Sequence, residues 1–114
     1  RINLTLLNQS LVLIQAEISV YPIGTSTTSS SFYIAKGIEA IQNIKEVRYE
    51  INSMGTILES NNIDSIFEAV KKIMEVTHNL GVNRVEMILK VDSRNDKQVK
   101  IEERVESIKK HLGK

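Results

Sequence analysis

The chain has 114 residues, 41% of them hydrophobic and 25% charged, which suits one compact globular domain. Its 15 basic and 14 acidic residues leave a formal net charge of +1, which argues against a nucleic-acid-binding module with a basic face. There is no cysteine, which excludes disulfides, thiol catalysis and thiolate metal sites and favours a reducing cytoplasm.

The first strand is predicted to begin at Val12, after a stretch without a sustained hydrophobic period. We therefore interpret residues 1–10 as an extension outside the domain, with an expression-vector origin left open, and residues 11–114 as a single domain. From Val12 to Val20 every second residue is apolar, which is typical of a strand with one buried face. The only proline, Pro22, lacks a backbone donor, so we expect the sheet ladder to stop there.

Residues 26–31, all Ser or Thr, then lead into a helix whose apolar positions include Ile34, Ile38 and Ile41. Hydroxyl side chains favour such junctions because they accept hydrogen bonds from the first helical turn. This polar loop, between a strand end and a helix N-terminus, is either a small-ligand site or simply a well-capped connection. The residues alone leave both interpretations open.

Two further strands are predicted over residues 47–52 and 56–59, with Gly55 between them as a site for an unusual backbone conformation or a bulge. Asn61 or Asn62 is then expected to cap a long helix that ends before Gly81. The apolar stripe of this helix is predicted to contain Ile63, Ile66, Phe67, Val70, Ile73, Met74, Thr77 and Leu80. A fourth strand alternates over 85–92, and a last helix follows over about 101–112.

The predicted order, β-α-β-β-α-β with an extra C-terminal helix, is that of an α+β ferredoxin-like sandwich with a four-stranded antiparallel sheet. Its two helices cover only one face of the sheet. The other face is expected to carry Glu17, Ser19, Tyr21, Glu50, Asn52, Ile88, Lys90 and Asp92. Burying this face requires a partner, most simply a second copy of the chain.

No catalytic or metal-binding pattern emerges from the sequence. His78 and His111 stand without a second ligand at helical spacing, so no metal site is expected. A Ser-His-Asp set, a phosphate-binding glycine loop and a nucleophile elbow are not found in it either, and nothing demands an enzyme. No apolar run approaches the roughly 20 residues of a membrane span, and neither a membrane nor a nucleic acid is an expected partner.

Four motifs in this order resemble one small family: Glu17–Thr25, Ser53–Thr56 followed by Glu59, Gly81–Arg84 and Asp92–Lys97. They are similar to the thiamine-binding proteins, once uncharacterised, which are related in fold to YkoF-type thiamine and hydroxymethylpyrimidine binders. The resemblance implies a ferredoxin-like domain that dimerises through its sheet and pairs again into tetramers. It also implies binding of thiamine or its hydroxymethylpyrimidine part, without a catalytic cofactor.

On this resemblance, a ligand pocket is expected near the end of the first strand. Hydroxyls and backbone groups suit the aminopyrimidine of thiamine, and a carboxylate suits its cationic thiazolium. The expected ligand-binding residues are Tyr21, Gly24, Thr25, Ser29, Ser31, Met54, Gly55, Thr56, Asp92 and Arg94. The competing hypothesis is a structural or regulatory homo-oligomer in which these residues make subunit contacts, and a small enzyme comes third.

Overall fold

The computed structural model describes residues 13–96 and 101–112, with the side chains of 101–104 left out. The predicted extension 1–10 and the predicted strand start at Val12 lie outside the described residues. The described elements are β1 (Ile14–Ile23), α2 (Ser31–Ile41), β2 (Arg48–Asn52), β3 (Gly55–Ser60), α3 (Ile63–Asn79), β4 (Arg84–Ser93) and α4 (Ile101–Leu112).

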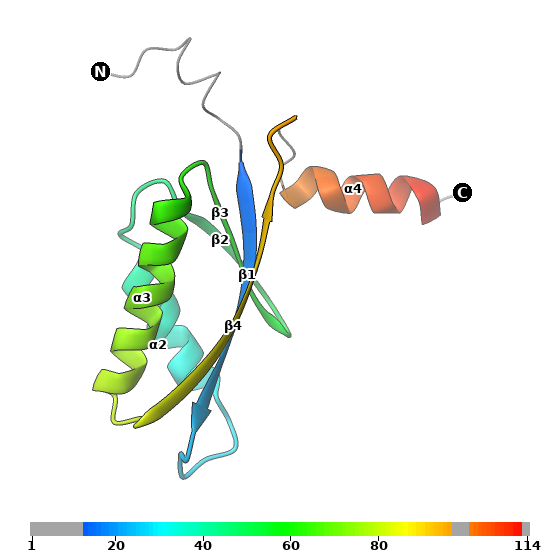
Figure 1. The fold of residues 1–114 in the computed structure, drawn as a ribbon. Helices are drawn as coiled ribbons and strands as arrows, with labels where there is room; N and C mark the ends of the chain where they lie inside the picture. Colours follow the sequence, from blue (N-terminus) through cyan, green and yellow to red (C-terminus); the bar gives the residue numbers. More distant parts are fainter. Residues whose placement is uncertain (1–12, 97–100, 113–114) are drawn as a thin grey trace.

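The four strands form one antiparallel sheet in the order β2-β3-β1-β4, with α2 and α3 side by side on one face (Figure 1). The predicted α+β ferredoxin-like sandwich is therefore confirmed. The sheet register also places all eight residues of the expected open face on the side away from α2 and α3, because directly paired residues of antiparallel strands share a face.

The prediction that the ladder stops at Pro22 is wrong, because β1 continues to Ile23 and Pro22 is opposite Val85 of β4. The pairing of β1 with β3 extends only from Ile14 to Ile18. Beyond Ile18, β1 has β4 as its neighbour on one side, and a proline is tolerated in a strand with a free side.

The core lies between the sheet and the two helices. It is aliphatic, as the aromatic content of 4% requires, and Ile18, Leu58 and Ile66 are at most 2% exposed. In α3 the buried residues are Ile66, Ala69, Ile73 and Thr77. The predicted stripe is therefore wrong at Phe67, Met74 and Leu80, which are exposed. The core-facing side of the helix is centred on Ala69 instead, and α3 ends at Asn79, before Leu80.

Both predicted ends of α3 are confirmed. Asn62 is the N-cap, and its side-chain oxygen accepts a hydrogen bond from the Asp64 backbone N–H at 2.9 Å. Gly81 follows the C-cap residue Leu80 and has a φ of +97°, the left-handed conformation that commonly ends a helix.

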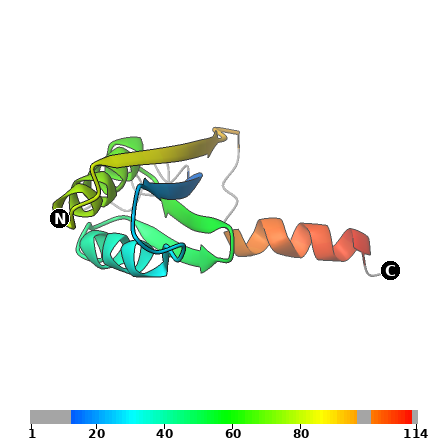
Figure 2. The same ribbon diagram turned by 90° about the horizontal axis from the view of Figure 1, so that it is seen from below.

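Helix α4 lies on the opposite side of the sheet from α2 and α3 and projects away from the sandwich (Figures 1 and 2). Its apolar side chains Val105, Ile108 and Leu112 are exposed. The described part of the chain therefore presents two exposed surfaces on the same side, namely the open sheet face, apart from its buried residues Gln15 and Glu59, and the apolar side of α4. No helix described here is long and apolar enough to cross a membrane.

Candidate functional site

A cavity of about 260 Å³ lies where the second half of β1, the β2–β3 hairpin and one side of α2 meet. Its lining includes four of the expected site residues, Tyr21, Met54, Gly55 and Thr56. Of the described residues around it, none carries a formal charge, and the polar groups are hydroxyls, a carboxamide and backbone. Such a cavity, apolar with a few convergent polar groups, is typical of small-molecule sites.

The β2–β3 hairpin forms one wall of the cavity, and its shape is held by two polar side chains. Asn52 Oδ1 accepts hydrogen bonds from the backbone N–H groups of Met54 and Gly55, both at 2.9 Å. The Ser19 hydroxyl donates to the Met54 carbonyl at 3.2 Å and so ties the turn to β1. Met54 itself is 80% exposed at the tip.

Gly55 is required here by space, not by an unusual backbone conformation. It is paired with Asn52 in the regular ladder, and its φ is not positive, so the expected unusual conformation or bulge is not observed. A Cβ at this position would lie 3.0 Å from the Ile18 carbonyl oxygen and 3.1 Å from Ser19 Oγ. A side chain would therefore push the hairpin away from β1 and change the cavity wall.

Thr56 supplies the one deeply buried hydroxyl of the cavity lining. The residue is 6% exposed, and in the part of the chain that the structure describes its side chain has no hydrogen-bond partner. A buried hydroxyl without a partner costs about 1–3 kcal/mol. A polar atom of a bound ligand can remove this cost, because Thr56 lines the cavity.

The Ser/Thr-rich loop meets the cavity through Ser30, the N-cap residue of α2. The expected site residues Gly24, Thr25, Ser29 and Ser31 do not line the cavity but lie in this loop and at the first residue of α2. The Thr25 hydroxyl donates to the Thr27 carbonyl at 2.7 Å, and the hydroxyls of Ser29 and Ser31 are 3.1 Å apart. Their observed contacts therefore shape the loop.

Asp92 and Arg94 lie at the other end of the sheet. Asp92 is opposite Gln15 on the open face, whereas Thr56 is opposite Ile18 on the core face. The structure therefore does not bring Asp92 together with Thr25 and Thr56 within one chain. Arg94 contacts Asp96 through two hydrogen bonds of 2.5 and 3.0 Å, and this hydrogen bonding, with the adjacent negative charge, raises the pKa of Arg94 above its usual value.

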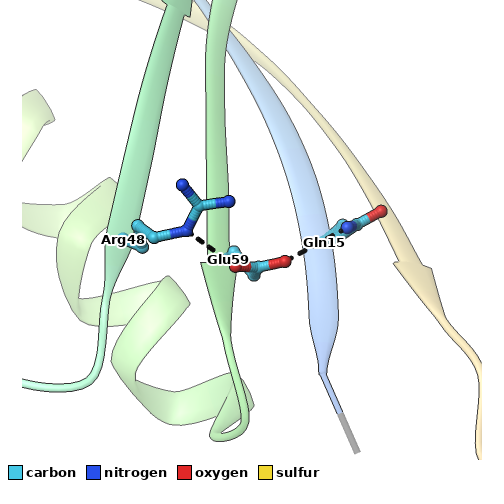
Figure 3. A network of polar contacts seen from close by, with 3 residues as sticks. All are labelled: Gln15, Arg48 and Glu59. Atoms are coloured by element: carbon cyan, nitrogen blue, oxygen red, sulfur yellow. Dashed lines mark hydrogen bonds and ion pairs between the residues drawn. The ribbon is translucent and has the colours of Figure 1, made fainter. Parts of the chain in front are cut away.

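At the Asp92 end, a polar network crosses the open face (Figure 3). Glu59 accepts a hydrogen bond from Arg48 Nε at 2.9 Å and another from Gln15 Nε2 at 3.3 Å. Glu59 is 5% exposed and Gln15 is 7% exposed, so these polar groups are buried and paired. Asp92 of β4 is directly opposite Gln15, so Arg48, Glu59, Gln15 and Asp92 form one row across all four strands.

Ser19, Ser30 and Asn52 were not among the expected site residues, although they line the cavity. Asn52 had a usable signal, because Asn is favoured at the first position of a tight turn. For Ser30, the sequence gives only a run of seven Ser and Thr residues, 25–31, and the choice among them depends on where α2 begins. Among the described residues, no group of three His, Asp or Glu side chains could hold a metal ion.

The fold and cavity define the protein class as a ferredoxin-like α+β sandwich with a small, uncharged cavity at the end of its first strand. Residues 16–109 match the family model described as "Thiamine-binding protein". The chain belongs to this family, as its motifs suggested.

Relatives from other organisms match along nearly their whole length. A UPF0045 protein of Methanothermobacter thermautotrophicus is 42% identical over 100 residues, which cover 88% of this chain and all of the relative. The crystal structure of the hypothetical protein MJ1052 of Methanocaldococcus jannaschii is similar with a TM-score of 0.77 and 35% identity, over 87% of this chain and 98% of that one. A Thermotoga maritima protein, provisionally named for thiamine biosynthesis or salvage, has a TM-score of 0.69 over 84% of this chain and 98% of that one. It shares the fold at 22% identity.

Proposed function

We propose that this protein binds thiamine, or its hydroxymethylpyrimidine part, in the cavity at the end of β1 and does not transform it. Membership of the thiamine-binding family supports the ligand class. The observation that carries the assignment to this cavity is the buried Thr56 hydroxyl, which lines it without a described partner. An aminopyrimidine offers both donors and acceptors to such a group.

The other lining groups suit a flat heterocycle. Tyr21 borders one side of the cavity from β1, and Ile18 and Ile73 contribute apolar walls. The volume of about 260 Å³ is slightly below the roughly 300–1,000 Å³ of pockets for drug-sized ligands, so it suits a small molecule. No acid–base pair lines the described cavity, which favours binding over catalysis.

Isothermal titration calorimetry with thiamine and with hydroxymethylpyrimidine tests the proposal directly. We expect saturable binding of at least one of them, with one site per chain. A lack of heat with both compounds, at protein concentrations that detect millimolar affinity, would reject the metabolite-binding function. The competing proposal, a structural or regulatory oligomer without a metabolite ligand, would then stand.

We further propose that the chain forms a homo-oligomer, a dimer through the open sheet face and then a tetramer. The exposed apolar residues of α4, on the same side as the open face, support this. A cytoplasmic location remains a prediction from the cysteine-free sequence.

Substitution of Ile108, which is 62% exposed on α4, tests the contribution of this helix. We expect Ile108→Glu to lower the oligomeric state in light scattering, because a charge on a buried apolar contact is costly. Ser107→Glu, on a neighbouring exposed position, adds the same single negative charge, so it is the matched control and should keep the assembly. A parent chain that is already monomeric at micromolar concentration would contradict the oligomer itself.

A further inference from the structure

The end of α2 that meets the cavity has unused hydrogen-bond donors. Helix α2 has 11 residues, and the side chain of its N-cap residue, Ser30, makes no capping hydrogen bond. Ile34 N–H donates to the Ser30 carbonyl, but the N–H groups of Phe32 and Tyr33 have no acceptor among the described residues. The first helical N–H groups normally need such a partner.

The charges around this helix end favour an anion. The first turn of α2 contains no acidic residue, and the first charged residue along the helix is Lys36. A helix N-terminus carries about half a positive charge and binds phosphate groups readily. Around the adjoining cavity no described residue provides a carboxylate that would repel an anion or pair with the thiazolium cation.

A second observation points to a ligand at the same place. Ser30 and Thr56 line one cavity, and Thr56 is 6% exposed, with a hydroxyl that has no described partner. Two kinds of polar group around this cavity therefore lack hydrogen-bond partners, namely the backbone N–H groups at the start of α2 and the Thr56 hydroxyl. A ligand with a phosphate at one end and an uncharged ring at the other would satisfy both.

Resting on the proposed function, we infer that the preferred ligand is a phosphate ester of the thiamine type, with its phosphate at the N-terminus of α2 and its ring beside Thr56. Two compounds share this chemistry, namely hydroxymethylpyrimidine phosphate and thiamine monophosphate. The uncharged cavity favours the pyrimidine ring as the part that enters it.

Calorimetry with four compounds tests the inference: hydroxymethylpyrimidine, thiamine and the monophosphate of each. We expect each phosphate ester to bind about 10- to 100-fold more tightly than its parent alcohol, the range for hydrogen bonds to a charged group. The preference should decrease as salt increases, because it is electrostatic. Comparison of the affinities of the two esters shows which of these two ligands the protein prefers.

A substitution at Ser30 locates the phosphate. Ser30→Asp should abolish the preference for the esters, because its carboxylate occupies the helix N-terminus, and should keep or raise the melting temperature as a better N-cap. Asn43→Asp adds the same charge in the loop after α2 and is the matched control, with an unchanged preference.

The outcomes separate this inference from the proposed function. Equal or tighter binding of the unphosphorylated compounds would overturn the inference and leave thiamine-type binding in place. A preference that survives in Ser30→Asp would also overturn it, because the phosphate would then bind elsewhere. No binding of any of the four compounds would overturn both.

Discussion

The polar groups at the two ends of β1 differ in whether they have hydrogen-bond partners within the chain. At the Gln15 end, the carboxylate of Glu59 is buried between Arg48 and Gln15, and its charge is neutralised within the chain. At the Tyr21 end, about 20 Å away along the strand, the lining is uncharged and the Thr56 hydroxyl has no described partner. Polar groups that are paired internally stabilise a fold, whereas polar groups left open at a cavity are available to a ligand.

The largest expected effect on ligand affinity comes from a side chain at Gly55, where the β2–β3 hairpin lies close to β1. Gly55→Val places side-chain atoms against the Ile18 carbonyl and Ser19, so the hairpin must move. We expect at least a tenfold loss of ligand affinity and a destabilisation of about 1–3 kcal/mol, measured by calorimetry and urea unfolding.

Gly24→Ala is the control for this substitution. Gly24 has a φ of +82°, but a Cβ added there would meet no atom within 4 Å, and the residue does not line the cavity. The variant should lose stability through backbone strain and keep ligand affinity. Unchanged affinity in Gly55→Val would mean that the ligand does not use this cavity.

The next largest effect is expected at Glu59, in the buried charged contact at the Gln15 end of β1. Glu59→Gln keeps the shape of the side chain but removes the charge that Arg48 and Gln15 contact. We expect a loss of about 1–2 kcal/mol in unfolding free energy, because a buried charge-assisted contact is weakened while Arg48 remains half exposed. Ligand affinity should stay the same, and a marked loss would show that the two ends are coupled.

A smaller effect is expected at Thr56, and Thr77 provides the matched comparison. Thr56→Val should weaken the ligand by about 1 kcal/mol, roughly fivefold, without loss of stability, since it removes a hydroxyl that has no described partner. The Thr77 hydroxyl donates to the Ile73 carbonyl at 2.7 Å and is fully buried. Thr77→Val should therefore cost about 1 kcal/mol of stability and leave binding intact. The reverse pattern would contradict a ligand contact at Thr56.

The smallest effect is expected at Asp92. Within one chain it lies far from the cavity, so Asp92→Asn should change thiamine affinity by less than about 0.5 kcal/mol. A weakening of roughly 1.5–3 kcal/mol would instead indicate that a second copy brings its Asp92 to the site. Titration of both proteins at concentrations above and below the dimer dissociation constant distinguishes these results.

The same contrast explains what could be predicted from the sequence. Alternation placed Glu17, Lys90 and Asp92 on the open face correctly, because period and face are local properties. It could not predict that Gln15 and Glu59 are buried there, since burial of a polar residue depends on partners from neighbouring strands. The extension of β1 past Pro22 was missed for the same reason, because it depends on where β3 ends.

The candidate site was predictable only in part. The motifs around Tyr21 and Met54–Thr56 indicated residues that line one cavity, because strand ends and hairpins are visible in the pattern. Asp92 was grouped with them although β4 runs antiparallel to β1, which places the end of β4 beside the start of β1. Ser30 was hidden in a run of similar residues, and only the start of α2 distinguishes it.

The position of Tyr21 also gives the protein an intrinsic optical reporter. The chain has no tryptophan and three tyrosines, so its near-ultraviolet emission comes from Tyr21, Tyr33 and Tyr49. Tyr21 lines the cavity and is 47% exposed, whereas the other two do not line it and are partly buried. A ligand bound at the Tyr21 side of the cavity would change the environment, and so the emission, of one of the three tyrosines. Occupancy of the site can therefore be followed without a label, with Tyr33 and Tyr49 as the constant background.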